Sequence, residues 1–233
     1  MTTVRQRTEK ITVDRGIQVS AVIAEPANYS AGEIDVIVLA HGAGADMNHP
    51  FMTFFHDALA RAGWLSVKFN FPYKELGRKA PDPAPRLEDA FERVLDHVRA
   101  NLRPGPGRLF AGGKSMGGRI AANVAAKDAD AEEKALAGLV FLGYPLHAPK
   151  RHDRLRADNL MKIAAPMLFV EGTNDPFCRM DLLAEVLKQV KAPTRTHLIE
   201  GGNHDFRVPK RLGREAGDIW QEVVEAICRW RGA

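Results

Sequence analysis

The sequence predicts an α/β protein of three layers, in which helices cover both faces of a mostly parallel central sheet. Two observations predict this class. Short apolar runs alternate with amphipathic helical patterns through most of the chain. In addition, residues 36–40 are apolar at every position, which is typical of a central strand buried on both faces. The opening segments differ, because residues 10–13 and 18–24 flank Asp14-Arg15-Gly16 and predict an antiparallel hairpin.

The elements predicted after the hairpin follow in regular order. Strands are predicted at residues 36–40, 64–69, 109–111, 139–142, 167–170 and 196–199. Helices are predicted at residues 51–62, 87–98, 118–126, 181–190 and 219–227, each with apolar residues three and four apart on one face. Residues 72–86 contain four prolines and predict a surface loop, and residues 146–160 predict a short cap-like connection. We expect a single domain over residues 1–233.

Composition excludes several classes of protein. The formal charge of +4 comes from 33 basic and 29 acidic residues that are interleaved, so we expect no nucleic-acid partner. No apolar run approaches the roughly 18 residues of a membrane span, and the charged N-terminal segment has no signal-peptide core. We therefore expect a cytoplasmic protein without a membrane partner. Cys178 and Cys228 are too few for a disulfide scaffold.

The most informative motif is Gly113-Lys114-Ser115-Met116-Gly117, between a predicted strand and a predicted helix. Glycines two residues before and after a serine suit a nucleophile elbow, a tight turn that lifts the hydroxyl above the sheet. Gly-Lys-Ser also ends a phosphate-binding loop, but in that register the first glycine would fall at Arg108 and the loop would occupy a predicted buried strand. The register therefore favours the elbow.

A serine nucleophile needs a histidine as base and an acid that orients the histidine. Asp175 follows the predicted strand 167–170, and His204 lies in a glycine-rich loop after the strand 196–199. Because catalytic groups of open α/β sheets gather at the carboxyl ends of strands, Ser115, Asp175 and His204 are predicted to converge. Asp181 and Asp205 are the alternative acids.

These residues carry a resemblance to a known family. The order serine, acid, histidine, the Gly-Lys-Ser-Met-Gly elbow and the turn His41-Gly42-Ala43-Gly44 resemble the α/β-hydrolase fold over essentially the whole chain. Within that fold the chain resembles the small, nearly capless members of the dienelactone-hydrolase-like group, and it is especially similar to the branch of the testis-expressed hydrolase-like protein and a chromatin-complex subunit. Dienelactone hydrolase itself uses a cysteine nucleophile, and this chain departs from it by having Ser115.

The resemblance implies an oxyanion hole formed by the backbone amides of Met116 and Ala43. His41 is expected to brace that loop, and Lys114 is expected to point away from the nucleophile and brace loops, or else to attract an anionic substrate. His41, Asp46 and His49 match no established zinc spacing, so no metal site is predicted. The side chains predicted to line a substrate pocket, with ordinary packing as the alternative, are Asn70, Tyr73, Tyr144 and Phe177.

The predicted function is hydrolysis of an ester or related acyl bond of a small, accessible substrate through an acyl-enzyme. It requires no cofactor, and the protein is expected to be a monomer or homodimer. One alternative is a non-catalytic hydrolase-fold protein that serves interactions. Another is a peptidase or acyltransferase that uses the same three residues.

Overall fold

The computed structural model describes residues 4–14, 16–27, 34–102, 107–127 and 131–232. Arg15, in the predicted hairpin turn, lies outside these residues. The described chain forms a mixed sheet of the strands β1 (Arg5–Asp14), β2 (Ile17–Glu25), β3 (Val36–Ala40), β4 (Leu65–Phe69), β5 (Leu109–Lys114), β6 (Gly138–Leu142), β7 (Met167–Gly172) and β8 (Thr194–Ile199). Every predicted strand is present.

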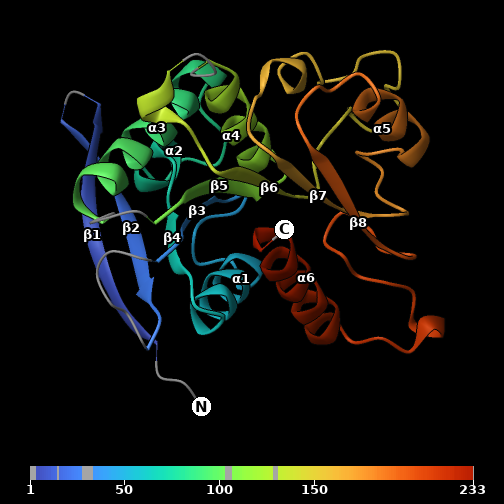
Figure 1. Ribbon diagram of the computed structural model, residues 1–233, viewed down its shortest axis with the longest axis horizontal. Coiled ribbons are helices and arrows are strands. Elements are labelled where there is room, and N and C mark those ends of the chain that lie inside the picture. The colour runs from blue at the N-terminus through green and yellow to red at the C-terminus, as the bar shows by residue number, and fades with distance from the viewer. Residues whose placement is uncertain (1–3, 15, 28–33, 103–106, 128–130, 233) are drawn as a thin grey trace.

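The strands are arranged in the order β1-β2-β4-β3-β5-β6-β7-β8 (Figure 1). β1 pairs antiparallel with β2, and β2 pairs antiparallel with β4. All the other pairs are parallel. The prediction of a mostly parallel sheet with an antiparallel N-terminal hairpin is therefore confirmed. In such a sheet the carboxyl ends of β3, β5, β6, β7 and β8 point the same way, so the loops that follow them can share one site.

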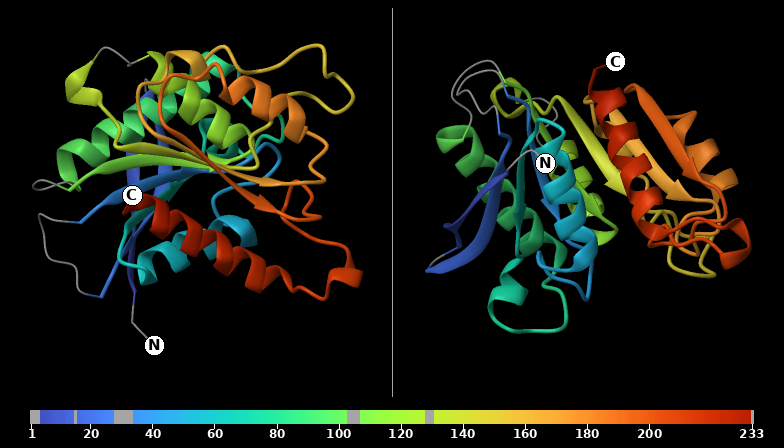
Figure 2. Two further views of the ribbon diagram at one scale, coloured as in Figure 1. Left: turned by 45° about the vertical axis from the view of Figure 1, so that its right-hand side comes forward. Right: turned by 90° about the horizontal axis from the view of Figure 1, so that it is seen from below.

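Helices cover both faces of the sheet, as the two views of Figure 2 show. α1 (Pro50–Arg61) and α6 (Ala216–Arg231) lie on one face and contact each other. α3 (Ala84–Asn101), α4 (Met116–Lys127) and α5 (Met180–Leu187) lie on the other. Successive residues of β3 alternate between two apolar cores, since Val38 packs with the α3 and α4 side and Leu39 with the α1 and α6 side. This alternation follows from the period of two of a strand.

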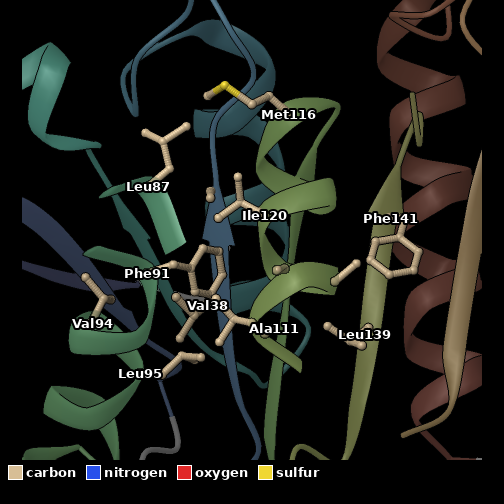
Figure 3. Packing of buried hydrophobic residues seen from close by; sticks show 14 of the residues in the cluster. Val38, Leu87, Phe91, Val94, Leu95, Ala111, Met116, Ile120, Leu139 and Phe141 are labelled. Carbon is tan, nitrogen blue, oxygen red and sulfur yellow. The ribbon is translucent and has the colours of Figure 1, made fainter. Parts of the chain in front are cut away.

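The larger core reaches from the centre of the sheet to the end that carries the predicted site. Figure 3 shows Phe91 of α3 and Ile120 of α4 packed over Val38 and Ala111, with Met116 and Leu87 at the upper end. Met116 follows the predicted nucleophile directly. The first turn of α4 is thus held by the same core that holds the sheet, which limits the movement of the adjacent serine.

Two connections differ from their predictions in detail. Residues 72–86 contain the short helix α2 (Pro72–Glu75) and the start of α3, because prolines at the first turn of each helix fit helical geometry. Residues 146–160 hold an isolated bridge between Ala148 and Arg151 and no α-helix. The short cap-like connection is therefore mostly irregular. None of the described helices is both long enough and apolar enough to cross a membrane.

Candidate active site

Ser115 occupies a strained turn between β5 and α4. Its φ is 51°, in the left-handed region that non-glycine residues rarely adopt. A Cβ on Gly113 or on Gly117 would lie 2.2 Å from the carbonyl oxygen of Ala40 in the neighbouring strand β3. The glycines on either side of the serine are therefore required by close approach of the backbone, which is the physical basis of the elbow motif. Strain of this kind is typical of functional sites.

The loops after β7 and β8 are joined by hydrogen bonds. Thr173 N–H donates to the carbonyl of Ile199 at 3.0 Å, and Asn174 N–H donates to the carbonyl of Gly202 at 2.8 Å. Gly201 N–H donates to the hydroxyl of Thr173 at 2.7 Å. These bonds fix the loop that carries Asp175 relative to the loop that carries His204.

Asp175 and His204 meet as the sequence predicts. Nδ1 of His204 lies 2.6 Å from Oδ2 of Asp175, and the Asp175 side chain is fully buried. The other oxygen, Oδ1, accepts a hydrogen bond of 2.7 Å from Phe177 N–H. A carboxylate held in this way favours the tautomer with the proton on Nδ1, which leaves Nε2 free to accept a proton. The Phe177 ring covers the imidazole at a centroid distance of 4.5 Å.

The two alternative acids, Asp181 and Asp205, pair with cationic side chains, whereas Asp175 pairs with His204. Asp181 forms an ion pair with Arg179 on the surface, and Asp205 lies 3.5 Å from the ammonium of Lys114. Ser115 and His204 line the same cavity, although within the described part of the chain the Ser115 hydroxyl makes no hydrogen bond. Catalytic hydrogen bonds often form only when substrate is bound.

The turn after β3 lies directly against the elbow. A Cβ on Gly42 would be 3.6 Å from Cβ of Ser115. The amide of Met116 is the first of α4, so no preceding turn of the helix offers it a carbonyl, and Ala43 borders the cavity beside it. Met116 and Ala43 thus border the cavity together with Ser115, and their oxyanion role stays a prediction of the resemblance.

His41 braces this turn. Its Nδ1 lies 2.9 Å from the carbonyl oxygen of Gly42, and its Nε2 accepts a hydrogen bond of 3.2 Å from Phe71 N–H. Burial lowers the pKa of His41 from 6.5 to about 4, so the ring is neutral near pH 7. This position fits the structural role expected for His41.

Lys114 is mostly buried in the wall of the same cavity as Ser115 and holds the histidine loop. Its ammonium donates a hydrogen bond of 2.6 Å to the carbonyl of His204 and lies 5.5 Å from the centroid of the Phe51 ring. Burial lowers the pKa of Lys114, while the nearby carboxylates of Asp205 and Asp175 raise it. Lys114 therefore braces loops, which was one of its two expected roles.

A second carboxyl group, that of Glu171 at the end of β7, lies beneath the site. Glu171 is fully buried, and its Oε1 accepts a hydrogen bond of 2.6 Å from Tyr144 N–H. Burial raises the pKa of Glu171 well above its usual value, and the charge of Asp175 raises it further. The sequence analysis missed Glu171, although its position directly at the end of a strand was a signal.

An open cavity of about 910 Å³ is lined by Ser115 and His204, whereas the buried Asp175 does not line it. Its lining includes Ala43, Ser115, Met116, Phe177 and His204. This volume is in the range of small-molecule sites. Another hollow, of about 940 Å³, lies beside α3 and the β1–β2 hairpin and contains none of the predicted site residues.

Three residues predicted to line the substrate pocket are not part of this lining. Asn70 links the loop before α1 to α2, since it accepts a hydrogen bond of 2.9 Å from Met47 N–H and donates one of 2.9 Å to Glu75. Tyr73 is buried against the ring of His41, at a centroid distance of 5.8 Å. Tyr144 is buried and donates its hydroxyl proton to the carbonyl of Arg156 at 2.9 Å. For these residues the packing alternative describes what the structure shows.

Two arginines that the sequence analysis did not select line the cavity instead. Arg119 lies on α4, one turn after Ser115, and Arg156 lies in the connection between β6 and β7. Among the described residues, no group of three or more histidine, cysteine, aspartate or glutamate side chains could hold a metal ion.

The strand order, the strand-to-helix elbow and the loops at the carboxyl ends of the strands define the α/β-hydrolase class of fold. The chain belongs to the α/β hydrolase domain family, whose model matches residues 33–232.

Similar solved structures agree with this assignment. Dienelactone hydrolase from Anabaena variabilis superposes with a TM-score of 0.75 at 17% identity, over 97% of this chain and 96% of that one. Est1E from Butyrivibrio proteoclasticus gives a TM-score of 0.72 at 15% identity, over 96% and 98% of the two chains. A serine hydrolase without a lid from Xanthomonas campestris gives a TM-score of 0.72 at 18% identity, over 96% of this chain and 95% of that one. These similarities show a common fold of the capless, dienelactone-hydrolase-like kind.

Proposed function

We propose that this protein is a serine hydrolase that cleaves an ester or related acyl bond of a small substrate through an acyl-enzyme. The observation that carries the proposal is the hydrogen bond of 2.6 Å between His204 and the buried Asp175, in a cavity shared with the strained Ser115. A structural histidine in a surface turn would need neither the buried acid nor a neighbouring serine.

In the proposed reaction, Ser115 Oγ attacks the substrate carbonyl carbon while Nε2 of His204 takes the hydroxyl proton. The amides of Met116 and Ala43 donate hydrogen bonds to the oxyanion, and each such donor contributes about 3 kcal/mol in the transition state. His204 then returns the proton to the leaving oxygen as the tetrahedral intermediate collapses to the acyl-enzyme. Water, deprotonated by His204, attacks the carbonyl carbon of the acyl-enzyme ester. His204 then gives that proton to Ser115 Oγ as the bond between Oγ and the acyl carbon breaks, which releases the acid and restores the serine.

Asp175 keeps the imidazole oriented and stabilises the imidazolium that forms in both half-reactions. Lys114 holds the backbone of the same histidine through its hydrogen bond to the His204 carbonyl. The openness of the site, without a helical cap in residues 146–160, favours a small or accessible substrate over a long lipid chain.

A panel of short-chain 4-nitrophenyl esters tests the proposal. The wild-type protein should hydrolyse at least one ester, and Ser115→Ala should reduce kcat/KM at least about 10³-fold. Melting curves of both proteins would control for folding. Equal turnover by the variant would exclude Ser115 as the nucleophile, and a folded protein inactive towards acyl substrates would favour the interaction-protein alternative.

A further inference from the structure

Two arginines from different parts of the chain face the cavity beside the nucleophile. Arg119 lies on α4, and its backbone N–H donates a hydrogen bond of 3.1 Å to the carbonyl of Ser115. Its side chain is half-buried at the cavity wall. It therefore lies one helical turn from the reacting serine on a rigid element.

The second arginine, Arg156, has a fixed backbone and a free side chain. Its N–H donates to the carbonyl of Leu146 at 2.7 Å, and its carbonyl accepts the hydroxyl of Tyr144 at 2.9 Å. Its side chain is exposed and lines the same cavity as Arg119 and Ser115. The buried Tyr144 thus positions Arg156 instead of contacting substrate.

Neither guanidinium has a counter-ion among the residues that the structure describes. The two acids that line the cavity already have cationic partners, since Asp82 lies 2.6 Å from Arg78 and Asp205 lies 3.5 Å from Lys114. A cavity with two unpaired guanidiniums and only paired acids carries an excess of positive charge.

Glu88, an acid whose charge acts on Arg119, also has a partner elsewhere. It accepts a hydrogen bond of 2.6 Å from the amide of Asn123 and forms no ion pair with Arg119. Burial lowers the pKa of Arg119, and repulsion from Arg156 lowers it further. Because arginine stays charged in proteins, the lowered pKa means that the charged Arg119 carries an unfavourable electrostatic energy. Binding of an anion in the cavity would offset that energy.

We infer that Arg119 and Arg156 together bind a carboxylate of the substrate, so that the preferred substrates are acidic esters. Guanidinium groups suit this role because their planar donors match the two oxygens of a carboxylate. The inference rests on the proposed function, since it assigns a substrate class to the same site. The carboxylate belongs to the acyl half or to the alcohol half of the ester, and the test below separates the two.

The test compares acidic and neutral esters of matched size. For the acyl half, the pair is the 4-nitrophenyl hemiester of adipate and its methyl ester. For the alcohol half, the pair is 4-butyryloxybenzoate and its methyl ester. The wild-type protein should prefer the acidic member of one pair in kcat/KM. In Arg119→Met and in Arg156→Met that preference should fall about 10-fold or more, as expected for loss of a charged hydrogen bond.

Arg154→Met is the matched control, because Arg154 lies in the same segment but does not line the cavity. It should keep the preference of the wild-type protein. Arg156→Glu should reverse the preference, and since this side chain is exposed, the variant keeps the test valid if Arg119→Met fails to fold.

Labelling by a fluorophosphonate tests the proposed hydrolase function separately from the proposed carboxylate site. If Ser115 is labelled but the wild-type protein shows no preference for either acidic ester, the proposed hydrolase stands and the carboxylate site is excluded. A preference that survives in both arginine variants would also overturn the inference. Absence of labelling in the folded wild-type protein would instead contradict the proposed function itself.

Discussion

Replacing Asp175 by asparagine tests which acid orients the catalytic histidine. In the wild-type protein Oδ2 accepts the Nδ1 proton of His204 at 2.6 Å, while Oδ1 accepts Phe177 N–H at 2.7 Å. The asparagine has only one carbonyl oxygen. If that oxygen keeps its bond to Phe177, the amide group faces Nδ1 and favours the tautomer with the proton on Nε2. That tautomer cannot take the proton of Ser115.

The expected loss follows from this geometry. A wrong tautomer in an otherwise intact serine–histidine–acid site reduces kcat about 10⁴-fold, which corresponds to about 5.5 kcal/mol of transition-state stabilisation. The assay is hydrolysis of a short-chain 4-nitrophenyl ester, corrected for spontaneous hydrolysis. Because asparagine has nearly the volume of aspartate, melting of the variant should stay close to that of the wild-type protein.

Asp181→Asn is the matched control, because Asp181 is exposed and forms a surface ion pair with Arg179. Its activity should stay within about twofold of wild type, since exposed ion pairs contribute little. The reasoning is refuted if Asp175→Asn keeps more than about a tenth of the activity. It is also refuted if Asp181→Asn or Asp205→Asn loses as much as Asp175→Asn.

Three further predictions concern residues that support the site and the fold. Lys114→Met should lower kcat about 10-fold or more in the same ester assay, because the ammonium that holds the His204 carbonyl at 2.6 Å is lost. Burial lowers the pKa of His56 from 6.5 to about 3, so between these pH values the unfolded chain binds a proton that the folded chain does not. The free energy of unfolding should therefore fall as the pH falls below about 6.5. Measured by urea unfolding, it should drop by about 2 kcal/mol more in the wild-type protein than in His56→Asn between about pH 7 and about pH 5. Gly117→Ala should lower the melting temperature sharply, because its Cβ would lie 2.2 Å from a backbone oxygen, whereas Gly217→Ala in α6, with open space at its Cβ, should raise stability by roughly 0.5 kcal/mol.

The positions of the strands were predictable because each apolar run ends at glycine, proline or a polar residue. The same rule places Asp175 and His204 at carboxyl ends of strands, and parallel pairing then brings them together. The hydrogen bond between them is consistent with the predicted roles. Local sequence signals sufficed here because each residue lies in the loop that follows its strand.

The wall of the cavity was much less predictable. Tyr73 and Tyr144 follow strands as the catalytic residues do, yet both turn into the core, because a large ring gains more by burial than by exposure at an open site. Arg119 and Arg156 share the cavity only because α4 and the connection after β6 meet in three dimensions. The spacing of these two arginines in the sequence does not predict that they line one cavity.

The most direct test of the central claim is the site of covalent attachment of a fluorophosphonate probe. The reagent reacts with a serine only when a base activates the hydroxyl, and its adduct can be located by peptide mass spectrometry. The account predicts one adduct, on Ser115, that is absent from Ser115→Ala and strongly slowed in His204→Ala. A folded wild-type protein without an adduct, or an adduct on another residue that persists in Ser115→Ala, would contradict it.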